Sequence, residues 1–236
     1  MSGDFYDVFE MAGGRYTGIV MADVCDHGVG SALFMALTRS LLRAYALQDT
    51  TKMEAAPEDF QAWSESVAVD AVRQTSEYIA GTHGEAGMFA TLFFGILDPH
   101  TGRLRYVNGG HEPPLILRGG RVINHLKATG LAVGALAGAP FRAAQAALEP
   151  GDCLVLYTDG ITDAADTDGA PFSKARLTTL AAESRLAAQE VVRRVVTALD
   201  RHVGSSAPSD DVTLLVVFRE PAASAGPEFP PGLQDP

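Results

Sequence analysis

Runs of alternating and continuous apolar residues predict a chain built largely from short β-strands. Near the beginning, residues 5–11 and 16–22 are rich in β-forming side chains and flank Ala12-Gly13-Gly14-Arg15, whose adjacent glycines permit positive φ. This pattern predicts a hairpin that ends at Asp23. Gly and Pro clusters then divide the middle of the chain into five β-type runs, which predict an antiparallel meander: 88–97, 104–107, 114–117, 122–125 and 141–148.

Two further strands are expected in the last third of the chain. Residues 153–158 are almost wholly apolar, which predicts a strand covered on both faces, and Asp159 follows directly. A final strand is expected at 212–218, directly after Ser209-Asp210-Asp211. Both strands therefore have aspartates at one end.

Helical spacing of apolar residues predicts two pairs of helices. In the first helix Ser31 is the expected N-cap, and the expected buried stripe is Phe34, Leu37, Leu41 and Tyr45. The second helix is expected to begin near Pro57, and its expected stripe is Phe60, Trp63, Val67, Ala71 and Tyr78. The second pair is expected at 174–183 and 188–203, the latter with Val191, Val192, Val195 and Leu199 on one side.

This grouping of elements favours an α+β fold over alternating βαβ units. One helical pair lies between the first hairpin and the middle strands, and the other precedes the last strand. We therefore expect a four-layer α-β-β-α sandwich, with two mainly antiparallel sheets face to face and a helical pair on each outer side. The expected domain spans residues 1–220. Residues 221–236 are rich in Pro, Ala and Gly, which is the composition of a disordered tail.

Charge and composition narrow the classes of partner. The 236 residues carry a net charge of −11, which would repel phosphate backbones and anionic lipid headgroups, so we expect neither nucleic acid nor a membrane surface as partner. The longest apolar run, 88–97, is about half of the roughly 20 residues that a membrane-spanning helix requires, so no membrane insertion is expected. Cys25 and Cys153 make neither a disulfide framework nor a zinc site, which favours the cytoplasm.

Four aspartates share one local context, at the point where an apolar strand meets a polar or Gly-rich turn: Asp4, Asp23, Asp159 and Asp210. Taken singly, each also fits ordinary turn chemistry, in which the carboxylate accepts hydrogen bonds from the backbone. Together they favour another interpretation, because carboxylates gathered at one end of a sheet stay ionised only with compensating positive charge. Oxygen-only ligands select hard cations such as Mg²⁺ or Mn²⁺ over zinc.

Five segments in order along the chain resemble the signature segments of the SpoIIE/RsbU-like branch of metal-dependent (type 2C, PPM) serine/threonine protein phosphatases. The resemblance covers residues 3 to about 219. The segments are Gly3-Asp4-Phe5-Tyr6-Asp7, the run from Ala22-Asp23-Val24 to Phe34-Met35, Asn108-Gly109-Gly110-His111-Glu112-Pro113-Pro114, Tyr157-Thr158-Asp159-Gly160-Ile161-Thr162-Asp163-Ala164, and Asp210-Asp211-Val212-Thr213.

The resemblance implies a phosphatase that holds two divalent cations, Mn²⁺ or Mg²⁺, at one end of a β-sandwich. It implies that Asp23 bridges both ions, that the Val24 carbonyl binds one, and that Asp159 and Asp210 complete the other shell. Asp4 is expected to act mostly through water. Asp7, Asp26 and Asp211 are second candidates. Water shared by the ions would attack the phosphoester of phosphoserine or phosphothreonine.

Two histidines lie in the quoted segments and are candidates for protonating the leaving group, His27 and His111. For both, a structural role is the favoured interpretation, with His27 at the start of its helix and His111 holding the Gly-Gly-His-Glu-Pro-Pro loop in shape. Asp26 departs from the glycine that many relatives carry there. Its carboxylate either faces the metals or caps the following helix.

The resemblance also implies a partner and a larger context. The expected substrate is a phosphorylated regulatory protein, an anti-sigma-factor antagonist in a partner-switching pathway. The chain begins abruptly at Ser2-Gly3-Asp4, which fits a domain preceded by sensory or helical regulatory segments, and a homodimer stays open. The alternative function is a catalytically silent interaction or scaffold module. Loss of ligand aspartates would mark that alternative, and all the expected aspartates are present.

Overall fold

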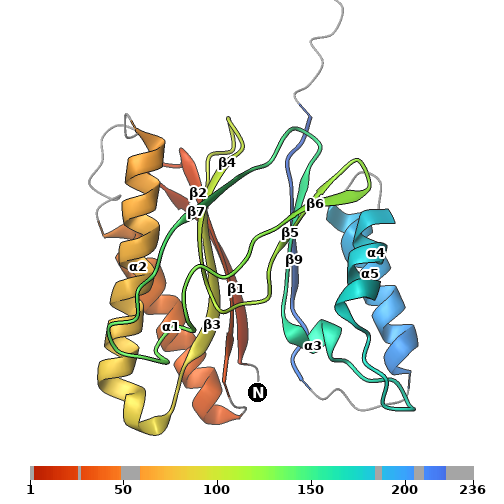
Figure 1. The fold of residues 1–236 in the computed structure, drawn as a ribbon, viewed down its shortest axis with the longest axis horizontal. Helices are drawn as coiled ribbons and strands as arrows, with labels where there is room; N and C mark the ends of the chain where they lie inside the picture. The colour runs from red at the N-terminus through yellow and green to blue at the C-terminus, as the bar shows by residue number, and fades with distance from the viewer. Residues whose placement is uncertain (1–2, 26–27, 49–58, 184–187, 205–209, 222–236) are drawn as a thin grey trace, which may run out of the picture.

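The computed structural model describes residues 3–25, 28–48, 59–183, 188–204 and 210–221, and they form two β-sheets packed face to face between two layers of helices (Figure 1). Every strand pairing within the two sheets is antiparallel. The predicted α+β sandwich is confirmed.

The two sheets differ in size. The five-stranded sheet contains, in spatial order, β1 (Asp4–Met11), β2 (Tyr16–Val24), β3 (Ala90–Leu97), β4 (Arg103–Gly109) and β7 (Ala144–Ala147). The four-stranded sheet contains, in spatial order, β6 (Arg121–His125), β5 (Leu115–Arg118), β8 (Cys153–Tyr157) and β9 (Leu214–Phe218). The predicted hairpin is β1–β2. Strand β8 is buried along its whole length, as its apolar sequence predicts.

The prediction of one meander in the middle of the chain is wrong. Strands β3 and β4 pair in the five-stranded sheet, and the chain then crosses to the other sheet to form the β5–β6 hairpin. It returns to place β7 beside β4. Short apolar runs look alike in either sheet of a sandwich, so the sequence pattern does not reveal where the chain changes sheets.

The helices lie on the outer faces of the sandwich. Helices α1 (Val29–Leu47) and α2 (Phe60–His83) cover the five-stranded sheet, and a short 3₁₀ turn, η1 (Gly84–Ala86), follows (Figure 1). Helices α4 (Lys174–Glu183) and α5 (Ala188–Val203) cover the four-stranded sheet, and the one-turn α3 (Asp159–Thr162) follows β8. The predicted ranges of α4 and α5 are confirmed. Among the described residues, no helix has the length and apolar character to cross a membrane.

The predicted beginnings of the first two helices need correction. The N-cap of α1 is Gly28, which makes no side-chain cap, whereas Ser31 lies inside the first turn and donates a weak 3.5 Å hydrogen bond to the Cys25 carbonyl. Helix α2 is capped by Asp59, whose carboxylate accepts hydrogen bonds from the N–H groups of Gln61 and Ala62. Pro57, the predicted start, lies outside the described residues.

The buried stripes of these helices also differ from the predicted ones. Tyr78 is 41% exposed, and small or polar residues replace several of the expected large ones. In α1 the buried residues are Ser31, Phe34, Thr38, Leu42 and Ala46. In α2 they are Phe60, Ser64, Ala68, Ala71, Val72, Thr75, Ser76 and Ile79. Small side chains allow helices to pack closely, and a prediction based on the spacing of apolar residues does not identify such positions as buried.

Hydrophobic residues fill all three spaces between the four layers. Adjacent residues of β2 pack into different layers of the core, because successive side chains of a strand point to opposite faces. Val20 packs under α1 and α2, whereas Ile19 and Met21 pack between the sheets with Phe93 and Leu154. The third core lies between the four-stranded sheet and its helices and includes Val155, Leu177, Val191 and Val195. By this alternation, Asp23 continues the inner face of β2.

Candidate metal centre

The β1–β2 hairpin brings the first two candidate aspartates together. Asp4 begins β1 and stands directly opposite Asp23 in the antiparallel register. Opposite residues on neighbouring strands project from the same face, so both carboxyl groups lie on the inner side of the five-stranded sheet. Asp4 is 8% exposed, and Val24 at the end of β2 is buried, with its N–H donating to the Gly3 carbonyl.

Thr158 connects this hairpin to the other sheet. It follows β8 directly, and its hydroxyl donates a 2.7 Å hydrogen bond to Asp4 Oδ2. The Thr158 hydroxyl oxygen also accepts a hydrogen bond from the Thr213 N–H at 3.1 Å, and the Thr158 N–H donates to the Thr213 carbonyl. Thr158 therefore links the start of β1, the end of β8 and the approach to β9, one residue before Asp159.

Asp159 and Asp210 meet at a close backbone contact. Asp159 is the first residue of α3, and Gly160 follows it. A methyl group on Gly160 would collide with the main-chain carbonyl of Asp211, so glycine is needed for the segment 210–211 to pack against α3. Asp210 is exposed and accepts a 2.8 Å hydrogen bond from the Asp211 N–H.

The carboxyl groups are close enough to act on one another. Burial, followed by the negative charges of Asp4, Asp159 and Asp210, raises the pKa of Asp23 from its ordinary 3.8 to about 7. Burial and then Asp210, Asp163 and Glu112 raise the pKa of Asp159. Burial also raises the pKa of Asp4, against the opposing effect of the Thr158 hydrogen bond. The structure thus brings all four candidates from both sheets into one electrostatic group.

The chemistry of this group fits a hard cation, although the arrangement is not a ready-made ligand cage. Within the described ranges, no three His, Cys, Asp or Glu side chains form a group that could hold a metal ion as they stand. The oxygen donors of Asp4, Asp23, Asp159 and Asp210 nevertheless repel one another, and a divalent cation is the partner that would relieve this repulsion. The donor set therefore suits Mg²⁺ or Mn²⁺ in chemical type.

The second candidates have different surroundings. Asp7 lies on the opposite face of β1 from Asp4 and accepts hydrogen bonds from Arg39 at 3.3 Å and Arg43 at 3.1 Å on α1. The structure does not bring it to the aspartate group. Asp211 does lie there, because it accepts a 2.8 Å hydrogen bond from the Gly3 N–H and raises the pKa of Asp4. Asp26 and His27 lie outside the described residues.

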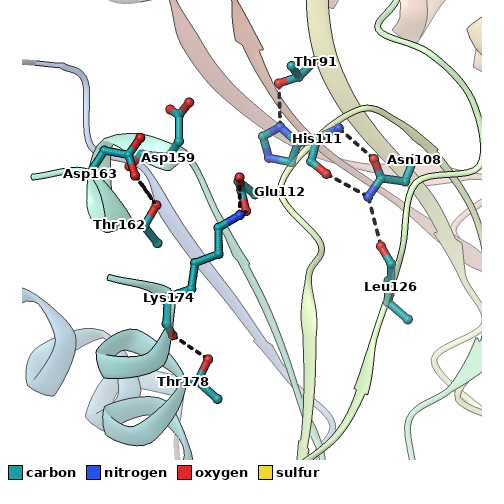
Figure 2. A network of polar contacts seen from close by, with 10 residues as sticks. All are labelled: Thr91, Asn108, His111, Glu112, Leu126, Asp159, Thr162, Asp163, Lys174 and Thr178. Atoms are coloured by element: carbon teal, nitrogen blue, oxygen red, sulfur yellow. Dashed lines mark hydrogen bonds and ion pairs between the residues drawn. The ribbon is translucent and has the colours of Figure 1, made fainter. Parts of the chain in front are cut away.

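Several residues around the site were not among the predicted candidates. Figure 2 shows that Thr91 and Asn108 hydrogen-bond to His111, which was a predicted candidate, and that Glu112 pairs with Lys174 near α3, the helix that begins with Asp159. The Lys174 Nζ to Glu112 Oε2 distance is 2.8 Å. Glu112 and Asp163 lie in the sequence segments that resemble the phosphatase family, and this position was the one signal that could have identified them as site residues. Nothing in the pattern around Thr91 indicated that it pairs with Asp23 across β2 and β3.

Comparisons with known proteins agree with this fold. The SiaA-PP2C domain of Pseudomonas aeruginosa superimposes with a TM-score of 0.74 at 20% identity, over 92% of this chain and 80% of that one, which shows a PP2C fold. The sequence model of the family Stage II sporulation protein E (SpoIIE) matches residues 13–220. The chain belongs to the SpoIIE family, as the resemblance predicted.

Two curated relatives span nearly the whole chain. Protein IcfG of Synechocystis sp. is 39% identical over 229 residues, which are 93% of this chain and 36% of that protein. Phosphoserine phosphatase RsbU of Bacillus subtilis is 26% identical over 222 residues, which are 93% of this chain and 60% of that protein. The chain thus spans less than two thirds of the length of either relative.

Proposed function

We propose that this chain is a metal-dependent protein serine/threonine phosphatase domain that hydrolyses phosphoserine or phosphothreonine on a regulatory protein. The observation that carries the proposal is the electrostatic group of Asp4, Asp23, Asp159 and Asp210, in which burial and mutual repulsion raise the pKa of Asp23 to about 7. Membership in the SpoIIE family supports it, as does the likeness to a relative named as a phosphoserine phosphatase.

The residues proposed to hold two Mn²⁺ or Mg²⁺ ions are Asp23, the Val24 carbonyl, Asp159 and Asp210, with Asp4 acting mostly through water. When bound, such a pair of ions lowers the pKa of water so that it attacks a phosphoester, and it neutralises charge on the phosphoryl oxygens. The chain's own part is to hold the donors in place. Thr158 orients Asp4 by its 2.7 Å hydrogen bond, and Gly160 admits the segment that carries Asp210.

His111 is poorly suited to protonating the leaving group as a charged acid. Its side chain is buried, and burial lowers its pKa to about 4, so the imidazole is neutral near pH 7. Water is therefore the better proton source, because the carboxylates of the aspartate group must be ionised to hold cations.

The proposed substrate is a phosphorylated anti-sigma-factor antagonist, and the proposed setting is a longer protein with N-terminal regulatory segments. Two observations support this. RsbU is named as a phosphoserine phosphatase, and both curated relatives are longer than this chain. The net charge of −11 agrees with a protein substrate rather than a nucleic acid. A homodimer is compatible with the proposal and is tested by solution mass.

Hydrolysis of a phosphoserine peptide and of a phosphorylated antagonist protein, with Mn²⁺ and with chelator, tests the proposal. We expect turnover that depends on Mn²⁺ and falls by about a hundredfold or more in Asp159→Asn, because a metal ligand is lost. Equal rates with and without chelator would contradict the metal mechanism. Undiminished partner binding without turnover in the unmodified chain would instead favour the scaffold alternative.

A further inference from the structure

His111 is held in place by its backbone, which leaves its ring available for another role. Asn108 is fully buried, and its side-chain oxygen accepts a 2.8 Å hydrogen bond from the His111 N–H. The amide nitrogen of Asn108 donates to the carbonyls of His111 at 3.1 Å and Leu126 at 2.9 Å. Asn108 therefore fixes the backbone of this loop without using the His111 ring (Figure 2).

One side of the His111 ring contacts the strand next to Asp23. Nδ1 lies 2.9 Å from the Thr91 hydroxyl oxygen, which is hydrogen-bond distance (Figure 2). Thr91 on β3 stands directly opposite Asp23 on β2, so the two side chains are neighbours on the inner face of the five-stranded sheet. A shift of Thr91 would shift the backbone that carries Asp23.

The ring also interacts with the other sheet. The Tyr157 backbone, at the end of β8, acts on the imidazole and partly offsets the lowering of its pKa. Within the described residues, Nε2 is buried and has no hydrogen-bond partner, so the Tyr157 backbone lies near the ring without a hydrogen bond to it. Tyr157 precedes Thr158 and Asp159. The ring is therefore placed between the strand of Asp23 and the strand that leads to Asp159.

We propose that His111 is a positioning residue that connects the loop between β4 and β5 to the strand of Asp23 through its Nδ1 contact with Thr91, and so sets where the Asp23 carboxylate lies relative to Asp159. The inference rests on the proposed function, because that spacing matters if both carboxylates hold divalent cations. A neutral imidazole suits the role, because its Nδ1 can accept a hydrogen bond from the Thr91 hydroxyl. Outer-shell partners of this kind orient ligands and commonly govern metal affinity.

A packing role and a positioning role make different demands on the side chains. If His111 only filled space, an apolar residue of similar size would replace it, and the Thr91 hydroxyl would be dispensable. If it positions the strands, the hydrogen-bonding ability of both residues is needed. The variants that separate the roles are His111→Leu, His111→Gln, Thr91→Val and Thr91→Ser. His125→Gln, at the exposed end of β6, is the matched control.

The experiment measures Mn²⁺ affinity by titration calorimetry on the whole chain, with thermal unfolding as the check on folding. We expect His111→Leu and Thr91→Val each to weaken Mn²⁺ binding by about tenfold or more. His111→Gln, Thr91→Ser and His125→Gln should stay close to the unmodified chain. The double variant His111→Leu/Thr91→Val should bind no more weakly than His111→Leu, because both changes break one connection.

Nitrogen NMR of the His111 ring gives a readout that needs no metal. We expect a neutral ring protonated at Nε2, with an Nδ1 signal that shifts in Thr91→Val and returns in Thr91→Ser. A folded Thr91→Val that binds Mn²⁺ normally would overturn the proposal, and so would His111→Gln that is as weak as His111→Leu. If His111→Leu fails to fold, the comparison of Thr91→Val with Thr91→Ser distinguishes the positioning role from the packing role.

The same measurements separate this inference from the proposed function. If the unmodified chain binds Mn²⁺ but hydrolyses no phosphoprotein, the proposed function fails, while the affinity ratios among the variants still decide the role of His111. If the unmodified chain hydrolyses phosphopeptides and the Thr91 and His111 variants match it in both affinity and turnover, the proposed function stands and the positioning role is wrong.

Discussion

Asp4 and Asp23 stand directly opposite each other where the open end of the β1–β2 hairpin faces the second sheet. Their carboxyl groups share one side of the sheet, and each contributes to the perturbed pKa of the other. Without a cation this arrangement is electrostatically unfavourable, and the unfavourable energy is available to drive cation binding. The predictions below follow from that relationship.

The stability of the metal-free protein should fall as the pH rises from about 4 to about 7. The pKa of Asp23 is raised from 3.8 to about 7 in the folded state, so the folded state holds a proton that the unfolded state has released. The stabilisation that comes from this bound proton is fully present below pH 3.8 and is lost as the pH rises through about 7, the pKa of Asp23 in the folded state. Urea unfolding in chelator across this range measures it. Stability that rises steadily from pH 4 to 7 would contradict the assignment, and added Mn²⁺ should reverse the fall.

Asp23→Asn should stabilise the metal-free protein at pH 7.5 while abolishing the stabilisation that Mn²⁺ confers. The amide carries no charge, so the repulsion from Asp4, Asp159 and Asp210 disappears together with a proposed ligand. Melting temperatures with chelator and with Mn²⁺ measure both effects. Asp200→Asn, an exposed change on α5, is the control and should alter neither value. A variant that melts lower in chelator and still responds to Mn²⁺ would argue against the carboxylate group.

Gly160→Ala should weaken Mn²⁺ binding by about tenfold or more, because the added methyl displaces the segment that carries Asp210. Gly81→Ala is the matched control, since a methyl there meets open space in the interior of α2. That control should leave binding unchanged and stabilise the helix by up to about 1 kcal/mol. Calorimetric titration of both variants decides the matter. Equal Mn²⁺ affinities would show that the contact between Gly160 and the segment 210–211 does not determine the geometry of the metal site.

Asp7→Asn and Asp4→Asn should separate a structural aspartate from a site aspartate. Asp7 pairs with Arg39 and Arg43 on α1, so its replacement should lower the free energy of unfolding by about 1–3 kcal/mol and leave Mn²⁺ affinity unchanged. Asp4→Asn should reduce Mn²⁺ affinity. Chemical unfolding and calorimetry on the two variants give the comparison. Loss of Mn²⁺ binding in a folded Asp7→Asn would restore Asp7 as a ligand candidate.

The elements of the fold were largely predictable because local pattern determines them. The ranges of α4 and α5 follow from apolar spacing, and β8 follows from an unbroken apolar run. The crossing of the chain between sheets after β4 was not predictable, because it depends on which partner each short strand finds. The start of α1 was missed because the available cap, Ser31, is turned toward the Cys25 carbonyl instead.

The site was predictable in its acidic residues but not in its supporting contacts. Asp23 and Asp159 are marked in the sequence by strand ends and by the resemblance. The roles of Thr158, Thr91 and Gly160 depend on register and on approach between segments far apart in the chain. Asp7 became a candidate because it lies in the first signature segment. Successive side chains of β1 point to opposite faces, however, and this alternation directs Asp7 toward α1 instead of the site.

The most direct test of the account is a crystal structure of the chain grown with Mn²⁺, with anomalous scattering used to locate the ions. The account predicts Mn²⁺ between the sheets, with Asp23 and Asp159 as ligands of a shared centre at oxygen distances of about 2.0–2.6 Å, and Asp210 in the same centre. Ions bound elsewhere, or Asp23 and Asp159 that remain apart with no ion between them in a fully loaded crystal, would contradict it.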